Sequence, residues 1–240
     1  PPPSPPPPYC WYHLPAASNT IINCQPHLAA SRTDLGVGGN CPTYGTLDAA
    51  KAACRRHAVL QRAELADASP DAAIMLAGHA AHLTGRYGCG VYAGYVPIHT
   101  ELSPLLLLDR LAGLGCDLAL PITPQAGQPL GFHRWEMAGL LVDGPFGTKQ
   151  PPARNDKCTP NVILAPMLAF DASGWRLGYG GGFYDRTMAG LREFDQRVTL
   201  IGIAYEGQKL DKIPVGSFDI PLDAVLSPAG MLELERSFEL

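Results

Sequence analysis

Residues 176–186, RLGYGGGFYDR, combine a glycine-rich turn with an acidic side chain. Glycine occupies four of the five positions from 178 to 182, and Asp185 follows shortly after. Glycine has no Cβ, so its backbone N–H groups can approach an anion closely, and the N-terminus of a following helix adds partial positive charge. The segment therefore predicts a site for a phosphate-bearing ligand, most simply a nucleotide.

The spacing of these glycines excludes two common phosphate loops. No Lys follows them, as a P-loop requires, and Phe183 stands where the dinucleotide-binding pattern needs its third glycine. The segment lies between a predicted strand and a predicted helix, the place where ligands bind in open α/β sheets. A tight turn whose glycines only permit close packing remains the alternative interpretation.

A second candidate for anion binding lies near the start of the regular sequence. Lys51 and Arg55 are four residues apart within a helix predicted over 46–66, with Thr46 as its N-cap. At this spacing two side chains share one helix face and can bind one anion together. A solvated basic helix face is the alternative.

Short apolar segments alternate with helical ones from residue 46 onward. We expect helices at 46–66, 69–83, 104–115 and 185–194, and strands at 90–96, 117–121, 138–142, 161–166 and 198–205. This alternation predicts one three-layer α/β/α domain with a mainly parallel sheet. The segment FHRWE, 132–136, is expected to be a loop at the rim of the substrate site or a partly buried connection.

The composition limits the classes of partner and compartment. The net charge of −4 gives no basic surface for nucleic acid, and no apolar run reaches the roughly 18 residues that a membrane-spanning helix needs. The seven cysteines lack CxxC spacing, which predicts neither a zinc site nor a disulfide framework but reduced thiols. We expect a cytoplasmic monomer.

Residues 1–45 differ from the rest of the chain. They begin with PPPSPPPP and show no helical or strand periodicity, so we expect a disordered or loosely attached leader, with the catalytic domain at 46–240. A polyproline ligand for a partner domain is the alternative, although no Arg or Lys flanks the proline run.

The glycine-rich segment and its surroundings resemble the signature of the 5-formyltetrahydrofolate cyclo-ligases, also called methenyltetrahydrofolate synthetases. Further segments agree with this family in order and spacing: KAACR (51–55), YVPIHTE (95–101), IGIAYEGQ (201–208) and IPVGSFDIPLD (213–223). The resemblance implies a Rossmann-like α/β/α fold of the CoA transferase type. It also implies ATP- and Mg²⁺-dependent conversion of 5-formyltetrahydrofolate to 5,10-methenyltetrahydrofolate, with release of ADP and phosphate.

The resemblance assigns roles to individual residues. ATP binding falls to Lys51, Arg55, Arg176, Leu177, Gly178, Tyr179, Gly180, Gly181, Gly182, Phe183 and Tyr184. Folate binding falls to Val96, Glu101 and, within the same segment, Tyr179, Gly180, Gly181, Gly182 and Phe183. Magnesium binding falls to Asp185 and Asp219. Two carboxylates together with phosphates and waters suit the hard oxygen preference of Mg²⁺.

Two other functions stay open at this point. A regulatory module of the same fold would bind nucleotide or folate without turnover. A Rossmann-type oxidoreductase is disfavoured because the third glycine of its fingerprint is missing. The chain also departs from the family pattern at Phe183, where Tyr is common, and at Gln150, where many relatives have Glu; Lys149 beside it has no assigned role.

Overall fold

The structure, a computed structural model, describes residues 46–193, 197–232 and 234. The predicted leader, residues 1–45, lies outside the described residues, so its separation from a domain at 46–240 stays a prediction.

The described residues form a mixed sheet of eight strands in the order β12-β11-β10-β7-β1-β2-β3-β6. The five inner strands from β11 to β2 run parallel, and antiparallel strands complete both edges. This confirms the predicted mainly parallel sheet. The strands are β1 (Val91–Ala93), β2 (Asp117–Ile122), β3 (Gly131–Arg134), β6 (Lys157–Cys158), β7 (Val162–Pro166), β10 (Thr199–Ile203), β11 (Ala224–Ser227) and β12 (Gly230–Leu232).

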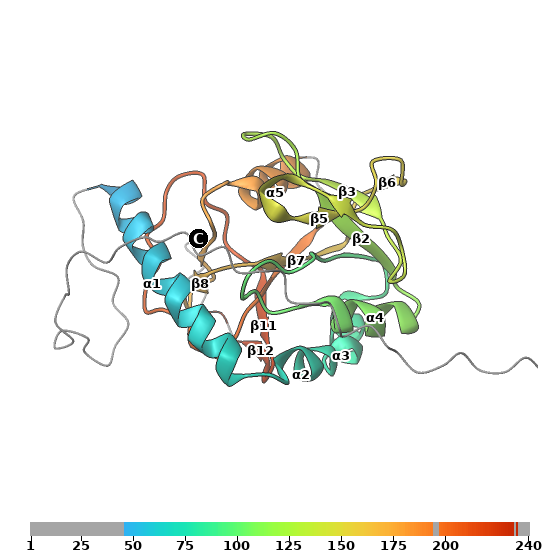
Figure 1. Cartoon of the computed structure of the whole chain (residues 1–240), viewed down its shortest axis with the longest axis horizontal. Helices are drawn as coiled ribbons and strands as arrows, with labels where there is room; N and C mark the ends of the chain where they lie inside the picture. The colour runs from blue at the N-terminus through green and yellow to red at the C-terminus, as the bar shows by residue number, and fades with distance from the viewer. Residues whose placement is uncertain (1–45, 194–196, 233, 235–240) are drawn as a thin grey trace, which may run out of the picture. The chain divides into compact units, whose positions relative to one another are not determined.

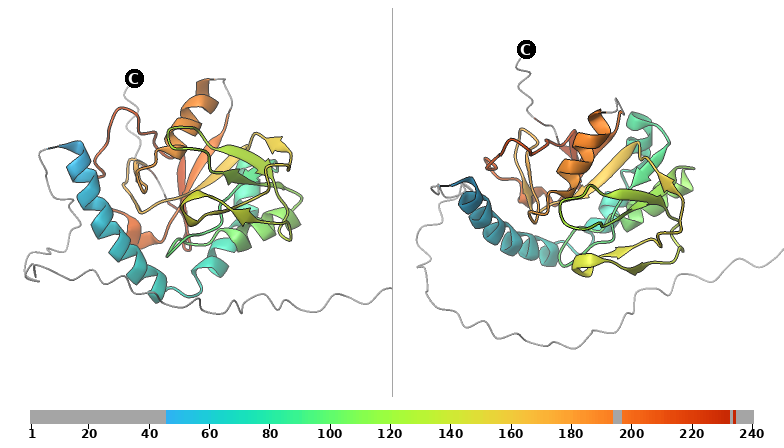
Figure 2. Two further views of the ribbon diagram at one scale, coloured as in Figure 1. Left: turned by 45° about the horizontal axis from the view of Figure 1, so that its top comes forward. Right: turned by 90° about the horizontal axis from the view of Figure 1, so that it is seen from above.

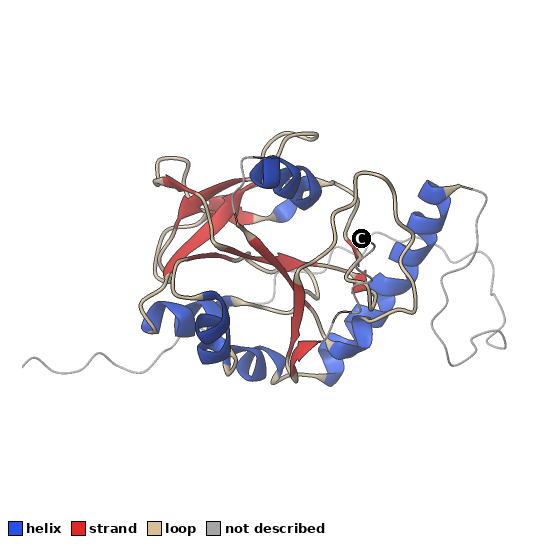
Figure 3. Cartoon of the chain, turned by 180° about the vertical axis from the view of Figure 1, so that it is seen from behind, coloured by secondary structure: helices blue, strands red, loops and turns tan. Residues whose placement is uncertain are grey.

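Helices cover both faces of this sheet (Figures 1 and 3). Helices α2 (Ala72–Ala77), α3 (Ala80–Tyr87) and α4 (Leu105–Gly113) pack on one face, where a core cluster includes Leu76, Leu107, Tyr92 and Leu164. Helix α5 (Phe183–Glu193) packs on the other face, where Met188 joins Ala93 and Ile163 in a second cluster. Successive strand residues point to opposite faces, so each inner strand is apolar on both sides.

Helix α1 (Leu47–Ala68) begins where the sequence predicts it. The Thr46 hydroxyl accepts a hydrogen bond from the Ala49 N–H at 3.3 Å, as expected of an N-cap residue. In Figure 2 this helix (blue) lies beside the loops that carry residues 205–220 (orange to red). A third cluster, with Cys54, Ala58 and Leu177, packs α1 against the segment that leads into the glycines.

Three local predictions are wrong. The helix expected at 69–83 is divided into α2 and α3, because the chain turns at Gly78, whose N–H donates to Met75 O at 3.0 Å. Of the strand expected at 138–142, only Val142 is in a strand; it starts β4 (Val142–Asp143), which pairs with β5 (Lys149–Gln150) in a separate hairpin. Residues 132–134, expected in a rim loop or a partly buried connection, belong to strand β3.

Within the part of the chain that the structure describes, the expectation of reduced thiols is wrong for Cys89 and Cys116. Cys89 and Cys116 form a disulfide with their Cα atoms 5.0 Å apart. Cys89 lies two residues before β1 and Cys116 one residue before β2. These two strands are parallel neighbours in the sheet, and the sequence spacing does not show that they are adjacent. Among the described residues, no helix is both long and apolar enough to cross a membrane.

Candidate active site

The candidate site lies at the carboxyl ends of β1 and β7. Strand β2 lies on one side of β1 and β7 on the other, so the chain leaves β1 in one direction and later returns on the opposite side. Ligands of open α/β sheets bind in the crevice that forms at such a reversal, here between β1 and β7. Residues 96–101 follow β1. The hairpin β8 (Ala169–Phe170) and β9 (Arg176–Leu177) follows β7 and leads into the glycine-rich segment.

The conformation of the glycine-rich segment requires its glycines. Gly180 and Gly182 have φ of 99° and 63°, in the left-handed region that favours glycine. A Cβ on Gly181 would approach the Phe183 ring to 2.7 Å. The N–H groups of Gly180, Gly181 and Gly182 donate to no group of the described residues, so they can receive an anion.

Helix α1 brings the predicted basic pair to this segment. Arg55 Nε donates to Gly178 O at 2.9 Å, and a Cβ on Gly180 would lie 3.1 Å from the Arg55 guanidinium. Lys51 Nζ forms an ion pair with Asp219 Oδ2. Lys51 and Arg55 therefore contact protein groups of the candidate site. The alternative interpretation, a basic helix face exposed to solvent, does not describe their positions.

The two predicted metal ligands are close in the fold. Asp185 Oδ1 accepts from Arg176 at 2.7 Å and from the N–H of Ile220, the neighbour of Asp219, at 3.1 Å. Asp219 Oδ2 accepts from Gly216 N–H at 2.7 Å. Asp185 Oδ2 and Asp219 Oδ1 accept no hydrogen bond within the described residues, so each carboxylate has an oxygen to offer Mg²⁺.

Two of the predicted folate residues, Val96 and Glu101, lie outside the glycine-rich segment and are more buried than Tyr179, which is 49% exposed. Val96 packs against the core below α2–α4, and the side chain of Glu101 is 4% exposed. Glu101 Oε2 accepts from Ile98 N–H at 2.9 Å. Burial raises the pKa of Glu101, while that hydrogen bond and the charge of Arg62 lower it.

Two tyrosines, the buried Tyr95 and the partly buried Tyr184, interact electrostatically with this carboxyl group. Burial and the Glu101 charge raise the pKa of Tyr95 and of Tyr184 well above the ordinary value. Both hydroxyls therefore stay protonated at neutral pH, and Tyr95 donates to Leu102 O at 2.6 Å.

Arg62 is a site residue that the sequence analysis missed. Its side chain is 1% exposed, and one of its terminal nitrogens donates to the Tyr179 hydroxyl within the glycine-rich segment. It lies seven residues after Arg55, so it occupies nearly the same face of α1. A basic residue seven positions after Arg55, two helical turns along nearly the same face, is the signal that could have found it.

Two strained residues border the glycine-rich segment. Among the described residues, His99 (φ 52°) and Phe146 (φ 59°) are the non-glycine residues with positive φ. The His99 ring is 6.4 Å from that of Tyr179, and the Phe146 ring is 6.1 Å from that of Phe183. Such strain is typical of functional sites because surrounding contacts must maintain it. Lys149, in strand β5 after Phe146, forms an ion pair with Asp143 at 2.6 Å on the protein surface.

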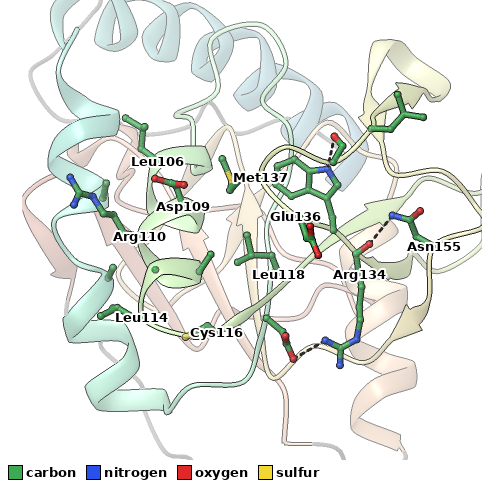
Figure 4. Close-up of a pocket in the computed structure, with 18 of the residues that line it drawn as sticks. Leu106, Asp109, Arg110, Leu114, Cys116, Leu118, Arg134, Glu136, Met137 and Asn155 are labelled. Carbon is green, nitrogen blue, oxygen red and sulfur yellow. Dashed lines mark hydrogen bonds and ion pairs between the residues drawn. The ribbon is translucent and has the colours of Figure 1, made fainter. Parts of the chain in front are cut away.

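A separate groove of about 1420 Å³ lies on the side of α2–α4 (Figure 4). Arg134, Trp135 and Glu136 line it, whereas no residue predicted to bind ATP, folate or metal does. Arg134 pairs with Asp117 at 2.7 Å, and His133 Nδ1 lies 2.7 Å from Asn155 O. The segment 132–136 is thus strand β3 with its continuation along this groove. The rim-loop alternative is wrong, whereas the mixture of buried and exposed residues in this segment agrees with the alternative of a partly buried connection.

Comparisons with known proteins identify a family for this chain. The model of the 5-formyltetrahydrofolate cyclo-ligase family matches residues 48–228. The chain is 42% identical over 146 residues to the cyclo-ligase of Escherichia coli K12, covering 59% of this chain and 79% of that protein. It is 36% identical over 153 residues to the cyclo-ligase of Mycolicibacterium smegmatis, covering 61% and 75%.

Solved structures show the same fold. The 5,10-methenyltetrahydrofolate synthetase of Aquifex aeolicus superposes with a TM-score of 0.60 at 23% identity, covering 79% of this chain and 95% of that chain. The synthetase of Mycoplasma pneumoniae gives a TM-score of 0.59 at 21% identity, covering 74% and 98%. With a family match over most of the described residues, the chain belongs to the 5-formyltetrahydrofolate cyclo-ligase family of ligases.

Proposed function

We propose that this protein converts 5-formyltetrahydrofolate and ATP to 5,10-methenyltetrahydrofolate, ADP and phosphate, with Mg²⁺ as cofactor. The main observation behind the proposal is that helix α1 contacts the glycine-rich segment. There Arg55 contacts the glycine-rich segment, and Lys51 pairs with Asp219, one of two carboxylates that each have an available oxygen. Triphosphate and metal binding needs these groups together.

The proposed chemistry has two steps. The formyl oxygen of the substrate attacks the γ-phosphorus of ATP, ADP leaves, and the carbon–oxygen unit becomes an activated iminium phosphate. Nitrogen N10 of the same folate then attacks the formyl carbon, the carbon–oxygen bond breaks, phosphate leaves, and N10 loses its proton. Because the substrate supplies its own nucleophile, the protein must chiefly orient two ligands and stabilise charge on the transferred phosphoryl group.

The chain's residues divide this work. Lys51 and Arg55 release their present partners, Asp219 and Gly178 O, to contact phosphate oxygens, and the amides of Gly180–Gly182 donate to the same group. Asp185 and Asp219 would hold Mg²⁺, which neutralises phosphate charge when bound. Glu101 accepts hydrogen bonds from the pterin ring, while Val96 and Phe183 provide apolar contacts. Arg176, Leu177, Tyr179 and Tyr184 complete the ligand contacts.

An absorbance assay for 5,10-methenyltetrahydrofolate tests the proposal. Product should form from 5-formyltetrahydrofolate only when both ATP and Mg²⁺ are present. If ATP binds but no product forms, the protein is instead a regulatory module of the same fold.

We further propose that the protein acts as a cytoplasmic monomer on small molecules and does not bind nucleic acid. The Cys89–Cys116 disulfide weighs against this compartment, because disulfides are rare in the cytosol. Cell fractionation with thiol trapping tests the location and the redox state of the pair together. Size-exclusion chromatography tests the monomer, and a DNA and RNA gel-shift assay tests the absence of nucleic-acid binding.

A further inference from the structure

Arg62 is a buried arginine for which the proposed chemistry has no role. Its side chain is 1% exposed, although an isolated buried charge is strongly unfavourable. Such a residue needs partners that compensate for the lost hydration, and the identity of those partners indicates what it organises.

The partners of Arg62 come from separate parts of the candidate site. Nε donates to Thr100 Oγ1 at 3.2 Å, and one terminal nitrogen donates to Met167 O, after β7, at 3.1 Å. That nitrogen also lies 3.9 Å from Glu101 Oε1. The other terminal nitrogen donates to the Tyr179 hydroxyl. A guanidinium group presents its donors in a rigid planar arrangement, so one side chain fixes all these groups relative to one another.

We propose that Arg62 is a positioning residue for the folate side of the site: it holds Glu101 and Tyr179 in the arrangement that binds 5-formyltetrahydrofolate. This inference rests on the proposed function and adds a residue to it. Arg62 contacts the segment after β1, the carboxyl end of β7 and the glycine-rich segment, which are the elements that meet at the crevice.

The geometry separates this role from ATP binding. Arg62 is seven residues beyond Arg55 on a continuous helix, a rise of about 10 Å. Arg55 contacts Gly178 and Gly180, whereas Arg62 lies near Glu101, which is assigned to folate alone, and contacts Tyr179, which is assigned to both ligands. Loss of Arg62 should therefore affect folate more than ATP.

The first test compares Arg62→Met with Arg56→Met, a matched change at an exposed position of the same helix. We expect Arg62→Met to raise the KM for 5-formyltetrahydrofolate about tenfold, as for loss of a charged hydrogen-bond network, with the KM for ATP within about twofold. Arg56→Met should change neither. An unchanged folate KM in Arg62→Met, or equal increases in both KM values, would overturn the proposal.

A second set of variants decides the question if Arg62→Met does not fold. Thr100→Val and Tyr179→Phe each remove one partner of Arg62 and keep the side-chain shape. Each should raise the folate KM with little change in melting temperature. If both leave the folate KM unchanged, Arg62 does not act through these groups and the inference fails.

The pH profile and chemical rescue separate positioning from a purely structural role. The Arg62 charge lowers the pKa of Glu101, which Tyr95 and Tyr184 also face, so Arg62→Met should move the acidic limb of folate binding to higher pH. Added guanidinium ion should restore folate binding to Arg62→Ala. If guanidinium does not restore binding and the acidic limb of Arg62→Met stays at the wild-type pH, Arg62 is not a positioning residue. Calorimetric titration of 5-formyltetrahydrofolate into the wild-type protein and the variants measures folate binding without turnover. The inference about Arg62 can therefore be tested even if the cyclo-ligase assay shows no product.

Discussion

Lys51 and Asp219, 168 residues apart in the chain, form an ion pair between α1 and the loop that precedes β11. Their side chains are 15% and 25% exposed, so solvent only partly screens the pair. The lysine that the resemblance assigns to ATP thus rests on the carboxylate that it assigns to magnesium. Binding of a metal–nucleotide complex would separate the two charges and give each a new partner.

Replacement of Lys51 by alanine should lower kcat about 100-fold, because a preformed donor to the transferred phosphoryl group is lost. Asp219→Asn should also reduce turnover. Both variants should stay folded, because the loss of one partly exposed ion pair is small beside the free energy of unfolding of about 5–15 kcal/mol that is typical of a domain. The absorbance assay and thermal unfolding check both statements, with Lys212→Ala at an exposed position as the control. Wild-type turnover in both site variants would contradict the assignment.

Asp185→Asn should increase the Mg²⁺ concentration required for half-maximal turnover by about tenfold, because a neutral amide is a weaker ligand than a carboxylate. The amide oxygen can still accept from the Ile220 N–H, so the local fold should persist. Titration of Mg²⁺ at saturating ATP measures the effect. The same Mg²⁺ requirement in variant and wild type would exclude Asp185 as a ligand.

Gly180→Ala should destabilise the protein by about 1–2 kcal/mol, because φ is 99° and the new Cβ would lie 3.1 Å from Arg55. Gly178→Ala is the matched control for stability: a Cβ there meets nothing within 4 Å. Urea unfolding measures both variants. Equal stability of the two would contradict the conformational requirement at Gly180.

Glu101 should make stability depend on pH. Its folded pKa is raised above 4.5, so the folded state binds the proton more tightly than the unfolded state does. The resulting stabilisation is complete below the unfolded pKa and is lost as pH rises through the folded pKa. Glu101→Gln removes this dependence, so the unfolding free energy of the wild type should fall relative to the variant as pH rises from 4 through that range. Parallel curves would show that the carboxyl group is not shifted.

Removal of the Cys89–Cys116 disulfide should reduce stability. The bond closes a loop with a sequence separation of 27, for which chain-entropy arguments give about 3 kcal/mol. Denaturant unfolding of Cys89→Ala/Cys116→Ala, compared with Cys158→Ala at a free cysteine, measures the difference. If reductant destabilises the wild type as much as the double replacement does, the bond is confirmed; no effect of either would contradict it.

Much of the fold follows from local patterns. The bounds of α1, its Thr46 cap and the alternation of apolar strands with helices depend on residues close in sequence, and the structure confirms them. The strand β3 was missed because a strand of only four residues, apolar for only part of its length, resembles a loop in sequence. Its pairing depends on β2 and β6, which the sequence does not place beside it.

The sequence by itself determined the chemistry available to this protein: a glycine-rich segment, a basic pair on one helix face and separate aspartates. These features depend on residue type and helical period, which are local. Only the tertiary structure decided that Lys51 meets Asp219, that Arg62 is buried between Glu101 and Tyr179, and that Cys89 meets Cys116. The order of strands brings these distant segments together, and that order reflects packing of the whole core.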